Sequence, residues 1–592
     1  MIEEVQKYWY KSWPEETPKH IDYKEMSLGE LLRQTAEIYP ESEALLFKGF
    51  RMTYSELDTI VDQFATGLAQ LGIEKGDVVA IDMPNIPQYI IAHFAILRLG
   101  AVSNPILPVN RYVEIVHQIN DSKAKSLIIL DYLYEEYLDG KDLSKMDSLE
   151  TIVLTKLTEY LPKVKGFLGK LLGKVPTMKN WPKRIEDIEF KAFQNILCAE
   201  QDIKVPEIEI DLKKDPAVLI YTGGTTGIPK GVKTSHYNLI VNAQQTDYWA
   251  STQLERMNEV KGKGGMLLVV PLAHSYGNIG MTVAILEGWS NVLIPRPPEN
   301  LSKLLAFVKK EDITFMPGVP TLFIKLIQDP DCEKYKGELD SLIACICAAS
   351  PLPKEVKKKF ENITEATILE GYGLSECSPV VSLNPFKRTK INTVGLPLPN
   401  TEVKIVNIED GVSILPQCTR ESCEECGMDE QKFIGEVCIK GPQVMMGYLS
   451  REEATQHALR SEPDGGIWLY TSDIGCIDKD GYLRLKDRKR DMIKYKGHSV
   501  FPREVEELIY MNEKVDEVAV VGAPDPIAGE NIKAFISLKP EFKGKISEQE
   551  ILEWCKENIS PYKYPRIVEI LPELPKTVIG KILKRELREI YN

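Results

Sequence analysis

The chain has 592 residues, of which 43% are hydrophobic and 27% are charged, a composition that excludes a disordered or fibrous protein. Its 73 Lys and Arg residues against 87 Asp and Glu residues give a formal net charge of −14. This acidic balance excludes a protein that binds nucleic acid over its whole surface, although one basic pocket can still bind a nucleotide. The length predicts more than one domain.

Apolar runs of strand length alternate with segments of helical period along most of the chain. Such runs occupy residues 78–83, 127–130, 217–221, 266–271 and 367–369. Near-continuous apolar strands followed by helices predict an α/β fold, with parallel-rich sheets covered by helices in a large N-terminal domain.

The end of the chain has a different pattern, beginning at a charged segment near Arg490. Two apolar strands at 515–523 and 531–538, a helix from Ser547 and a basic C-terminus predict a small α+β unit of ordinary domain size. We therefore expect a large domain at 1–487 and a small, mobile C-terminal domain at 488–592.

Several features bear on the compartment. Eleven cysteines scattered over a long chain favour a reducing, cytoplasmic location, and the charged N-terminus has no apolar core of signal-peptide length. Residues 266–286 carry no Asp, Glu, Lys or Arg, but Pro271, Gly277 and Gly280 interrupt them. We expect a buried strand, a loop and a buried helix there rather than a membrane span.

A basic segment stands out at residues 156–184, where seven lysines and one arginine accompany a single glutamate. Its lysines are interleaved with Leu, Val and Phe in LPKVKGFLGKLLGK, a pattern that favours peripheral contact with an anionic membrane. Glycines weaken a helix, so a solvated loop is the competing interpretation.

Three cysteines, Cys418, Cys423 and Cys426, lie close together, and Cys438 follows them. Three or four thiolates can hold a structural metal ion. The paired CxxC spacing of common zinc sites is missing, so a cysteine-rich surface loop is the alternative.

A loop rich in glycine and threonine follows the apolar run 217–221. Residues 221–231 read YTGGTTGIPKG, and their exposed backbone N–H groups, hydroxyls and Lys230 all suit a bound phosphate. The order differs from a Walker A loop, which needs Gly-Lys-Ser/Thr at a helix start, and from the G-x-G-x-x-G dinucleotide fingerprint.

A second motif, GYGLSE, follows the apolar run 367–369. Its tyrosine offers a flat face for a purine, and Ser375 and Glu376 offer oxygens for phosphate and a hard cation. A tight turn with a surface glutamate is the competing interpretation.

Together these motifs resemble the adenylate-forming superfamily, which comprises acyl-CoA synthetases, peptide-synthetase adenylation domains and luciferases. The resemblance extends over nearly the whole chain. The segments YKSWPEETP, GLSECSPVVSLNP, IKGPQVMMGY and PYKYPR are most similar to long-chain fatty acid–CoA ligases of the bacterial type.

The resemblance implies a nucleotide site in which Tyr372 stacks on adenine, Asp473 binds both ribose hydroxyls and Glu376 binds Mg²⁺. Arg488 would reach ribose and phosphate, and Ser472 stands where the family usually has glycine. The other residues implied to contact ATP are Thr222, Gly223, Gly224, Thr225, Thr226, Gly227, Lys230, Ala349, Ser350, Gly371, Gly373 and Ser375.

The resemblance also implies catalytic roles. His274 would lie between the nucleotide and acyl pockets, Lys581 would serve adenylate formation, and Lys494 would serve thioester formation. Gly497 would line the path of the CoA pantetheine arm.

The implied function is an ATP-dependent, AMP-forming acyl-CoA synthetase that uses ATP, Mg²⁺ and CoA to activate a fatty acid, in the long-chain range. A medium-chain or aryl acid–CoA ligase is the alternative within the superfamily. From other classes, a P-loop-type NTPase or kinase and a non-catalytic lipid-binding relative stay open. The sequence leaves the oligomeric state open, with a homodimer among the options.

Overall fold

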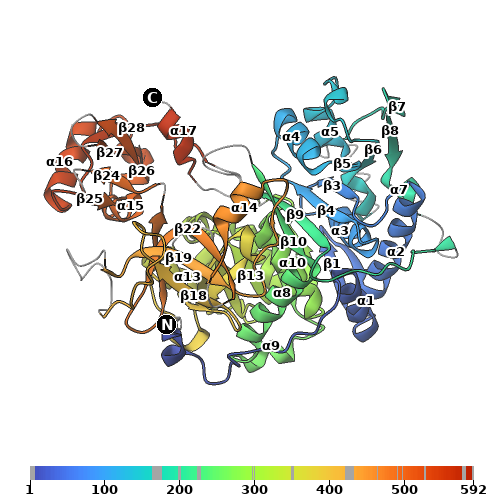
Figure 1. Cartoon of the computed structure of the whole chain (residues 1–592), viewed down its shortest axis with the longest axis horizontal. Helices are drawn as coiled ribbons and strands as arrows, with labels where there is room; N and C mark the ends of the chain where they lie inside the picture. Colours follow the sequence, from blue (N-terminus) through green and yellow to red (C-terminus); the bar gives the residue numbers. More distant parts are fainter. Residues whose placement is uncertain are drawn as a thin grey trace.

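A computed structural model gives the fold of the chain (Figure 1). It describes residues 7–162, 177–197, 202–222, 229–296, 298, 300–348, 352–419, 432–462, 465–489, 491–495, 498–525, 529–576 and 582–589. Within these ranges the strands form four sheets, two of nine strands and two of five.

The first nine-stranded sheet is parallel at its centre and antiparallel at its edges. Its strand order is β17 (Leu396–Pro397), β16 (Val380–Leu383), β15 (Thr367–Gly373), β14 (Ala344–Cys347), β13 (Phe315–Gly318), β11 (Gly265–Leu268), β12 (Ser290–Leu293), β1 (Glu43–Phe47) and β2 (Phe50–Thr53).

The second nine-stranded sheet follows the same plan, with antiparallel pairs only toward its two edges. Its strand order is β20 (Gly447–Tyr448), β10 (Lys230–Ser235), β9 (Pro216–Thr222), β4 (Val102–Ile106), β3 (Val78–Asp82), β5 (Ser126–Leu130), β6 (Thr151–Thr155), β8 (Ile188–Ala192) and β7 (Arg184–Ile185).

The main apolar core joins these two sheets. One hydrophobic cluster contains Leu268 of the first sheet, Val79 of the second, and residues of α3 (Pro87–Arg98) and α10 (Ser275–Leu286). Every residue of α3 is buried, which explains why its sequence is apolar all round rather than on one face. Parallel strands covered by helices confirm the predicted fold class.

Within the described residues, further α-helices accompany these sheets. They are α1 (Leu28–Ile38), α2 (Tyr54–Gln70), α4 (Tyr112–Ser122), α5 (Asp131–Tyr137), α7 (Phe193–Ile196), α8 (His236–Ser251), α9 (Glu255–Glu259), α11 (Ser302–Lys310), α12 (Pro320–Gln328), α13 (Lys354–Thr364), α14 (Glu452–Ala458), α15 (Pro502–Ile509), α16 (Glu548–Asn558) and α17 (Lys584–Glu589).

The uncharged stretch 266–286 folds as expected, into β11, a loop and the buried helix α10. Among the residues that the structure describes, no helix is both long and apolar enough to cross a membrane.

Two five-stranded sheets complete the fold. The third sheet has the order β18 (Glu402–Val406), β19 (Gly435–Lys440), β22 (Ile467–Ile477) and β21 (Leu459–Ser461), with β23 (Leu483–Arg488) paired to β22. The fourth has the order β25 (His498–Val500), β24 (Ile493–Tyr495), β27 (Gly529–Leu538) and β26 (Val515–Asp525), with β28 (Ile567–Ile570) paired to β27.

The fourth sheet is built only from residues beyond 492, and the predicted strands and the helix after Ser547 are confirmed as β26, β27 and α16. Figure 1 shows these elements, in red, gathered at one end of the molecule. The third sheet ends at Arg488, so the chain passes from one sheet to the next within residues 489–492.

One predicted element is longer than its apolar run. The run at 367–369 belongs to β15, which continues through Gly373 because Gly371 and Tyr372 pair with Leu383 and Ser382 of β16. A Cβ at Gly373 would lie 2.5 Å from the Pro379 carbonyl oxygen, so glycine permits this close approach. The first half of the GYGLSE motif therefore ends a strand, and its Ser375 and Glu376 lie on the 3₁₀ turn that follows the strand.

The cysteine cluster is only partly described. Cys418 is buried in an apolar cluster with Ile474 and Phe501, whereas Cys438 is buried in a different one with Trp468. Cys423 and Cys426 lie outside the described residues, and the described part of the chain holds no group of three or more His, Cys, Asp or Glu that could bind a metal ion. The metal site and the cysteine-rich surface loop therefore both stay predictions, because two of the four cysteines lie outside the described residues.

Residues 163–176 of the basic segment also lie outside the described residues. At its start, the Lys156 ammonium lies 4.4 Å from the ring centre of Trp181.

Candidate nucleotide and acyl site

Tyr372, Asp473 and Arg488 form a polar triad in which Tyr372 and Asp473 are buried and the Arg488 side chain is partly exposed. The Tyr372 hydroxyl donates to Asp473 Oδ2 at 2.6 Å, and Arg488 Nε lies 3.0 Å from Asp473 Oδ1. Asp473 and Arg488 are direct partners in the antiparallel pair of β22 and β23. The sequence thus brings together one aromatic, one anionic and one cationic group from two sheets, at the positions implied for adenine and ribose.

The charges of this triad are mutually stabilising. The Asp473 carboxylate raises the pKa of Arg488, and burial, reinforced by Asp473, raises the pKa of Tyr372 well above its ordinary value. Both partners therefore stay hydrogen-bond donors at neutral pH, and the carboxylate is held in one orientation.

Ser472, the residue directly before Asp473, has an unusual backbone conformation. Its backbone has φ +61°, a left-handed conformation that glycine adopts easily and serine seldom does. The Ser472 N–H donates to Glu436 Oε1 at 2.9 Å, and the Lys489 ammonium lies 2.9 Å from the other oxygen of the same carboxylate. Serine at this position therefore adopts a glycine-like backbone conformation at a cost in backbone strain.

Glu376 lies on the short 3₁₀ turn Ser375–Cys377 that follows β15. Tyr448 of β20 donates its hydroxyl to Glu376 Oε1 at 2.8 Å, and no described residue donates to the second oxygen. This half-buried carboxylate suits a Mg²⁺ ion, which is usually held by one or two carboxylates and completes its shell with phosphate oxygens and water.

The two ends of the predicted phosphate loop are paired strand residues. Thr222 ends β9, Lys230 begins β10, and the two are direct antiparallel partners. The Lys230 ammonium lies 5.0 Å from the ring centre of Tyr448, whose hydroxyl holds Glu376. The structure therefore links the loop lysine and the predicted metal ligand through one tyrosine.

His274 caps the N-terminus of α10, where its Nδ1 accepts a hydrogen bond from the Tyr276 N–H at 3.1 Å. The next residue, Ser275, lies 3.1 Å from Ser375 between hydroxyl oxygens. This contact sets the start of α10 beside the end of β15. The Tyr276 hydroxyl donates to the Ile346 carbonyl at 2.9 Å, which ties the same turn to β14.

Lys494 lies exposed on β24, in the fourth sheet, and its N–H donates to Glu530 Oε2 at 2.7 Å. The structure thus puts Lys494 in the fourth sheet, whereas Tyr372 lies in the first sheet and Asp473 and Arg488 lie in the third. Several predicted residues lie outside the described residues: Gly223, Gly224, Thr225, Thr226, Gly227, Ala349, Ser350, Gly497 and Lys581.

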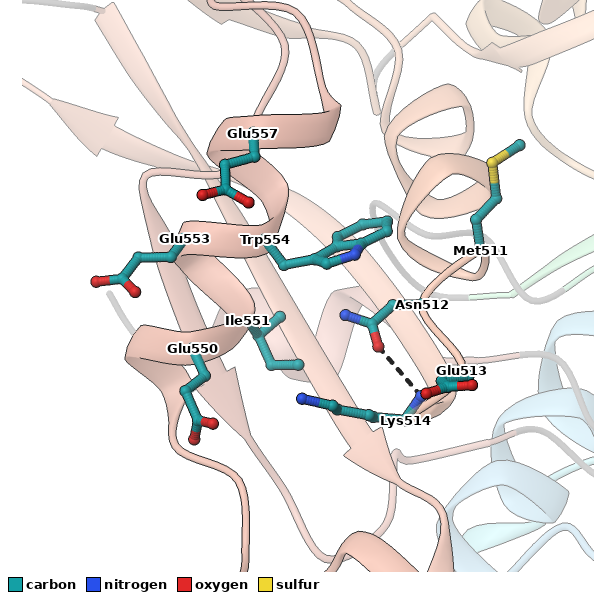
Figure 2. A pocket seen from close by; sticks show the side chains of 9 residues that line it. All are labelled: Met511, Asn512, Glu513, Lys514, Glu550, Ile551, Glu553, Trp554 and Glu557. Carbon is teal, nitrogen blue, oxygen red and sulfur yellow. Dashed lines mark hydrogen bonds between the residues drawn. The ribbon is translucent and has the colours of Figure 1, made fainter.

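Two surface pockets lie elsewhere. One, of about 530 Å³, is bounded by the chain after α15 and by α16, where Trp554 lies beside Asn512 and the α16 carboxylates lie on one side (Figure 2). The other, of about 720 Å³, includes Tyr23, Tyr237 and Lys440. No residue predicted for the site lines either pocket.

Sequence reasoning did not single out Tyr448, although it lies in the quoted segment IKGPQVMMGY. Its partners Glu376 and Lys230 are far away in the chain, and their contact depends on β20 pairing with β10. A strand of two residues leaves no periodic signal that could have revealed this pairing.

Comparisons with known proteins agree with this architecture. Residues 32–449 match the model of the AMP-binding enzyme family, and residues 504–581 match that of the AMP-binding enzyme C-terminal domain. The chain therefore belongs to the AMP-binding enzyme family, which confirms the resemblance to adenylate-forming enzymes and excludes the P-loop alternative.

Particular relatives cover the whole chain. It is 35% identical to a long-chain-fatty-acid–CoA ligase of Bacillus subtilis (strain 168) and 33% identical to one of Salmonella typhimurium, each over 99% of this chain and 98% of the relative. Its fold resembles that of the anthranilate CoA ligase AuaEII in complex with anthranoyl-AMP, with a TM-score of 0.78 at 23% identity over 96% of this chain and 97% of the other.

Proposed function

We propose that this enzyme is an ATP-dependent, AMP-forming acyl-CoA synthetase that acts on fatty acids in the long-chain range. The observation that carries the proposal is the joining of the Tyr372–Asp473–Arg488 triad, Glu376 and the ends of the phosphate loop in one region. Relatives that match over the whole length and are named long-chain-fatty-acid–CoA ligases support the choice of substrate.

The reaction has two steps. The carboxylate of the acid attacks the α-phosphorus of ATP, which forms an acyl-adenylate and releases pyrophosphate. The CoA thiolate then attacks the acyl carbon and releases AMP. No protein nucleophile takes part, so the enzyme contributes positioning and electrostatic stabilisation of the charge on the phosphate oxygens.

The described residues have distinct tasks in the first step. Tyr372 presents its ring to adenine, and Asp473, already oriented by Arg488, accepts the ribose hydroxyls. Thr222, Lys230 and Ser375 bind phosphate oxygens, and His274 lies where the acid meets the nucleotide. Glu376 holds Mg²⁺, which neutralises phosphate charge when it is bound.

The second step uses a different arrangement of the same chain. We propose a large unit, residues 1–487, that binds ATP and acid, and a small unit, residues 488–592, that turns between the two steps. Lys581 stabilises the adenylation transition state and Lys494 serves thioester formation, so one site performs two reactions in sequence. The exposed position of Lys494 on a separate sheet is compatible with this role.

The acid is identified by supplying the full-length protein with ATP, Mg²⁺, CoA and a series of acids from acetate through palmitate to cinnamate. Pyrophosphate and acyl-CoA should form fastest with long-chain acids. A maximum at medium-chain acids or cinnamate would replace the substrate but keep the enzyme class. Absence of any acid-dependent pyrophosphate release would support the non-catalytic lipid-binding alternative.

We also propose that the basic segment 156–184 brings the enzyme to anionic membranes, where long-chain acids partition. Replacing Lys163, Lys165, Lys170 and Lys174 with glutamine should weaken sedimentation with anionic vesicles and leave turnover of soluble short acids unchanged. Unchanged vesicle binding would contradict the membrane role. A homodimer stays a proposal that analytical ultracentrifugation decides.

A further inference from the structure

Both ends of the phosphate loop rest on one helix, α4. At the loop's exit, His117 Nε2 donates to the Pro229 carbonyl at 3.1 Å. At its entrance, the Tyr221 hydroxyl donates to Asp121 Oδ2 at 2.9 Å. His117 and Asp121 are four residues apart and therefore lie on the same face of the helix.

Asp121 divides its carboxylate between two partners. While Oδ2 accepts from Tyr221, Oδ1 accepts from an Arg451 guanidinium nitrogen at 2.6 Å. The Asp121 side chain is only 8% exposed, so its carboxylate is shielded from water although the Arg451 side chain is partly exposed, and its charge-assisted bond is stronger than a neutral one.

Arg451 connects this contact to the other side of the site. It is the N-cap residue of α14 and follows β20, whose Tyr448 holds Glu376 and lies under Lys230. The Asp121–Arg451 pair therefore joins α4 to the strand that orients the predicted metal ligand.

Besides its hydrogen bond to Asp121, the Tyr221 side chain packs against Gly231 and His117. A Cβ at Gly231 would lie 3.1 to 3.3 Å from atoms of this ring, so only glycine leaves room for it at ordinary contact distance. The edge of the His117 ring meets the Tyr221 ring at 89°, with 6.3 Å between ring centres. Burial, and then the Asp121 charge, raises the pKa of Tyr221, which keeps the hydroxyl a donor.

We propose that Asp121 is a positioning residue for ATP binding, because it holds the entrance of the phosphate loop through Tyr221 and anchors it to Arg451. The inference rests on the proposed function, since it takes ATP phosphates as the ligand of the loop. Asp121 touches no substrate. It lowers the number of conformations that the loop ends can adopt before ATP binds, and preorganisation of this kind raises affinity.

Three variants test the proposal. Tyr221→Phe removes one hydrogen bond and keeps the ring and the ion pair, Asp121→Asn keeps the shape of the side chain and removes its charge, and the third variant combines both. The matched control is Asp62→Asn on α2, which disturbs a comparably buried pair with Arg98 away from the site. Binding of ATP with Mg²⁺ is measured by calorimetry without acid, and melting temperatures are recorded in parallel.

Each single variant should raise the Kd for ATP roughly three- to tenfold, where tenfold corresponds to about 1.4 kcal/mol. The KM for ATP should rise with it, while the KM for the acid and the affinity of the Asp62→Asn control for ATP stay within twofold. The double variant should bind ATP no more weakly than the worse single variant, because both changes break the same connection.

Two results would overturn the inference while the wild type binds ATP. One is a Kd within twofold of the wild type in both single variants, with a lowered melting temperature as the only effect. The other is fully additive losses in the double variant. Failure of the wild type to bind ATP would overturn the proposed function and this inference together.

Discussion

At the scale of single residues, the Tyr448 side chain contacts both Glu376 and Lys230. Its hydroxyl fixes Glu376 Oε1, and its ring lies under the Lys230 ammonium at 5.0 Å. A bond to one oxygen of a metal-binding carboxylate fixes the direction in which the other oxygen points. The loop lysine gains a cation–π contact from the same ring.

The Glu376 contact can be separated from the Lys230 contact by Tyr448→Phe, which keeps the ring and removes the hydroxyl. We expect the Mg²⁺ concentration that half-saturates ATP binding to rise about tenfold, the lower end of the losses seen when a partner of a metal ligand is removed. The measurement is ATP calorimetry over a Mg²⁺ series. The control is Tyr482→Phe, which removes a hydroxyl bonded to the Arg388 carbonyl. An unchanged Mg²⁺ dependence in Tyr448→Phe would contradict the proposal that the Tyr448 hydroxyl orients Glu376.

Ser472 gives a second prediction at this scale, because its left-handed backbone costs a non-glycine residue about 1 kcal/mol or more. Ser472→Gly should raise the free energy of unfolding by up to about 1 kcal/mol, since relief of the strain outweighs the entropy that glycine loses on folding. Ser472→Val should lower it, because a β-branched residue tolerates this conformation least. Urea denaturation compares the three proteins, and a less stable Ser472→Gly would show that the serine is not strained.

Sequence reasoning at the residue scale predicts a role where a motif carries its own chemistry. Glycines, hydroxyls and a lysine within one loop predict a phosphate site, and the glutamate of GYGLSE predicts a cation ligand. It failed for Asp121 and Arg451, which lie 330 positions apart. Their pairing joins the end of α4 to the N-cap of α14 and exists only in the folded chain, and neither residue has a local pattern that distinguishes it from a surface charge.

At the scale of elements, α8 and α10 bury two carboxylates beside each other. Glu287, directly after α10, is 3% exposed and Asp247 of α8 is 8% exposed, and Lys261 lies 3.2 Å from Glu287. Burial, and then the Asp247 charge, raises the pKa of Glu287 to about 8. The folded protein therefore holds a proton that the unfolded chain releases at lower pH.

This proton gives the helix pair a pH-dependent stability. From the ordinary glutamate value of 4.5 up to about 8, the unfolded chain binds fewer protons than the folded protein, so the free energy of unfolding falls as pH rises. Glu287→Gln should remove this slope, and its stability relative to the wild type should improve between pH 5 and pH 8. Denaturation at several pH values measures this free energy. The control is Glu355→Gln, on the exposed side of α13. Parallel pH profiles of Glu287→Gln and the wild type would contradict the raised pKa of Glu287.

Elements were predictable where burial leaves a continuous apolar run, as in β3, β5 and β9, and where a capping residue marks a helix start. Ser547 accepts a hydrogen bond from the Glu550 N–H, and α16 begins where its sequence indicates. The extension of β15 through Gly373 was not predictable, because it depends on antiparallel pairing with β16 rather than on the hydrophobicity of its own residues.

At the scale of the whole molecule, the change of sheet between Arg488 and Ile493 separates the groups proposed for the two steps. The triad and Glu376 lie before it, and Lys494 lies after it. A chain divided in this way can present different side chains to one bound intermediate, which fits two sequential reactions at a single site.

The division predicts separable half-reactions. Lys581→Ala should abolish pyrophosphate release from ATP and acid but still convert supplied acyl-adenylate and CoA to acyl-CoA. Lys494→Ala should do the reverse, because the proposed mechanism gives each lysine only one step. Single-turnover assays of both steps measure this, and loss of the same half-reaction in both variants would contradict the two-arrangement account.

The central claim, that the acid becomes an acyl-adenylate, is tested most directly by transfer of oxygen from the acid. Palmitate labelled with ¹⁸O in its carboxylate is incubated with the enzyme, ATP, Mg²⁺ and CoA, and the nucleotide product is analysed by mass spectrometry. The carboxylate oxygen that attacks phosphorus stays on the phosphate when CoA attacks the acyl carbon. We predict AMP that carries one labelled oxygen, whereas unlabelled AMP, or ADP as the nucleotide product, would contradict the account.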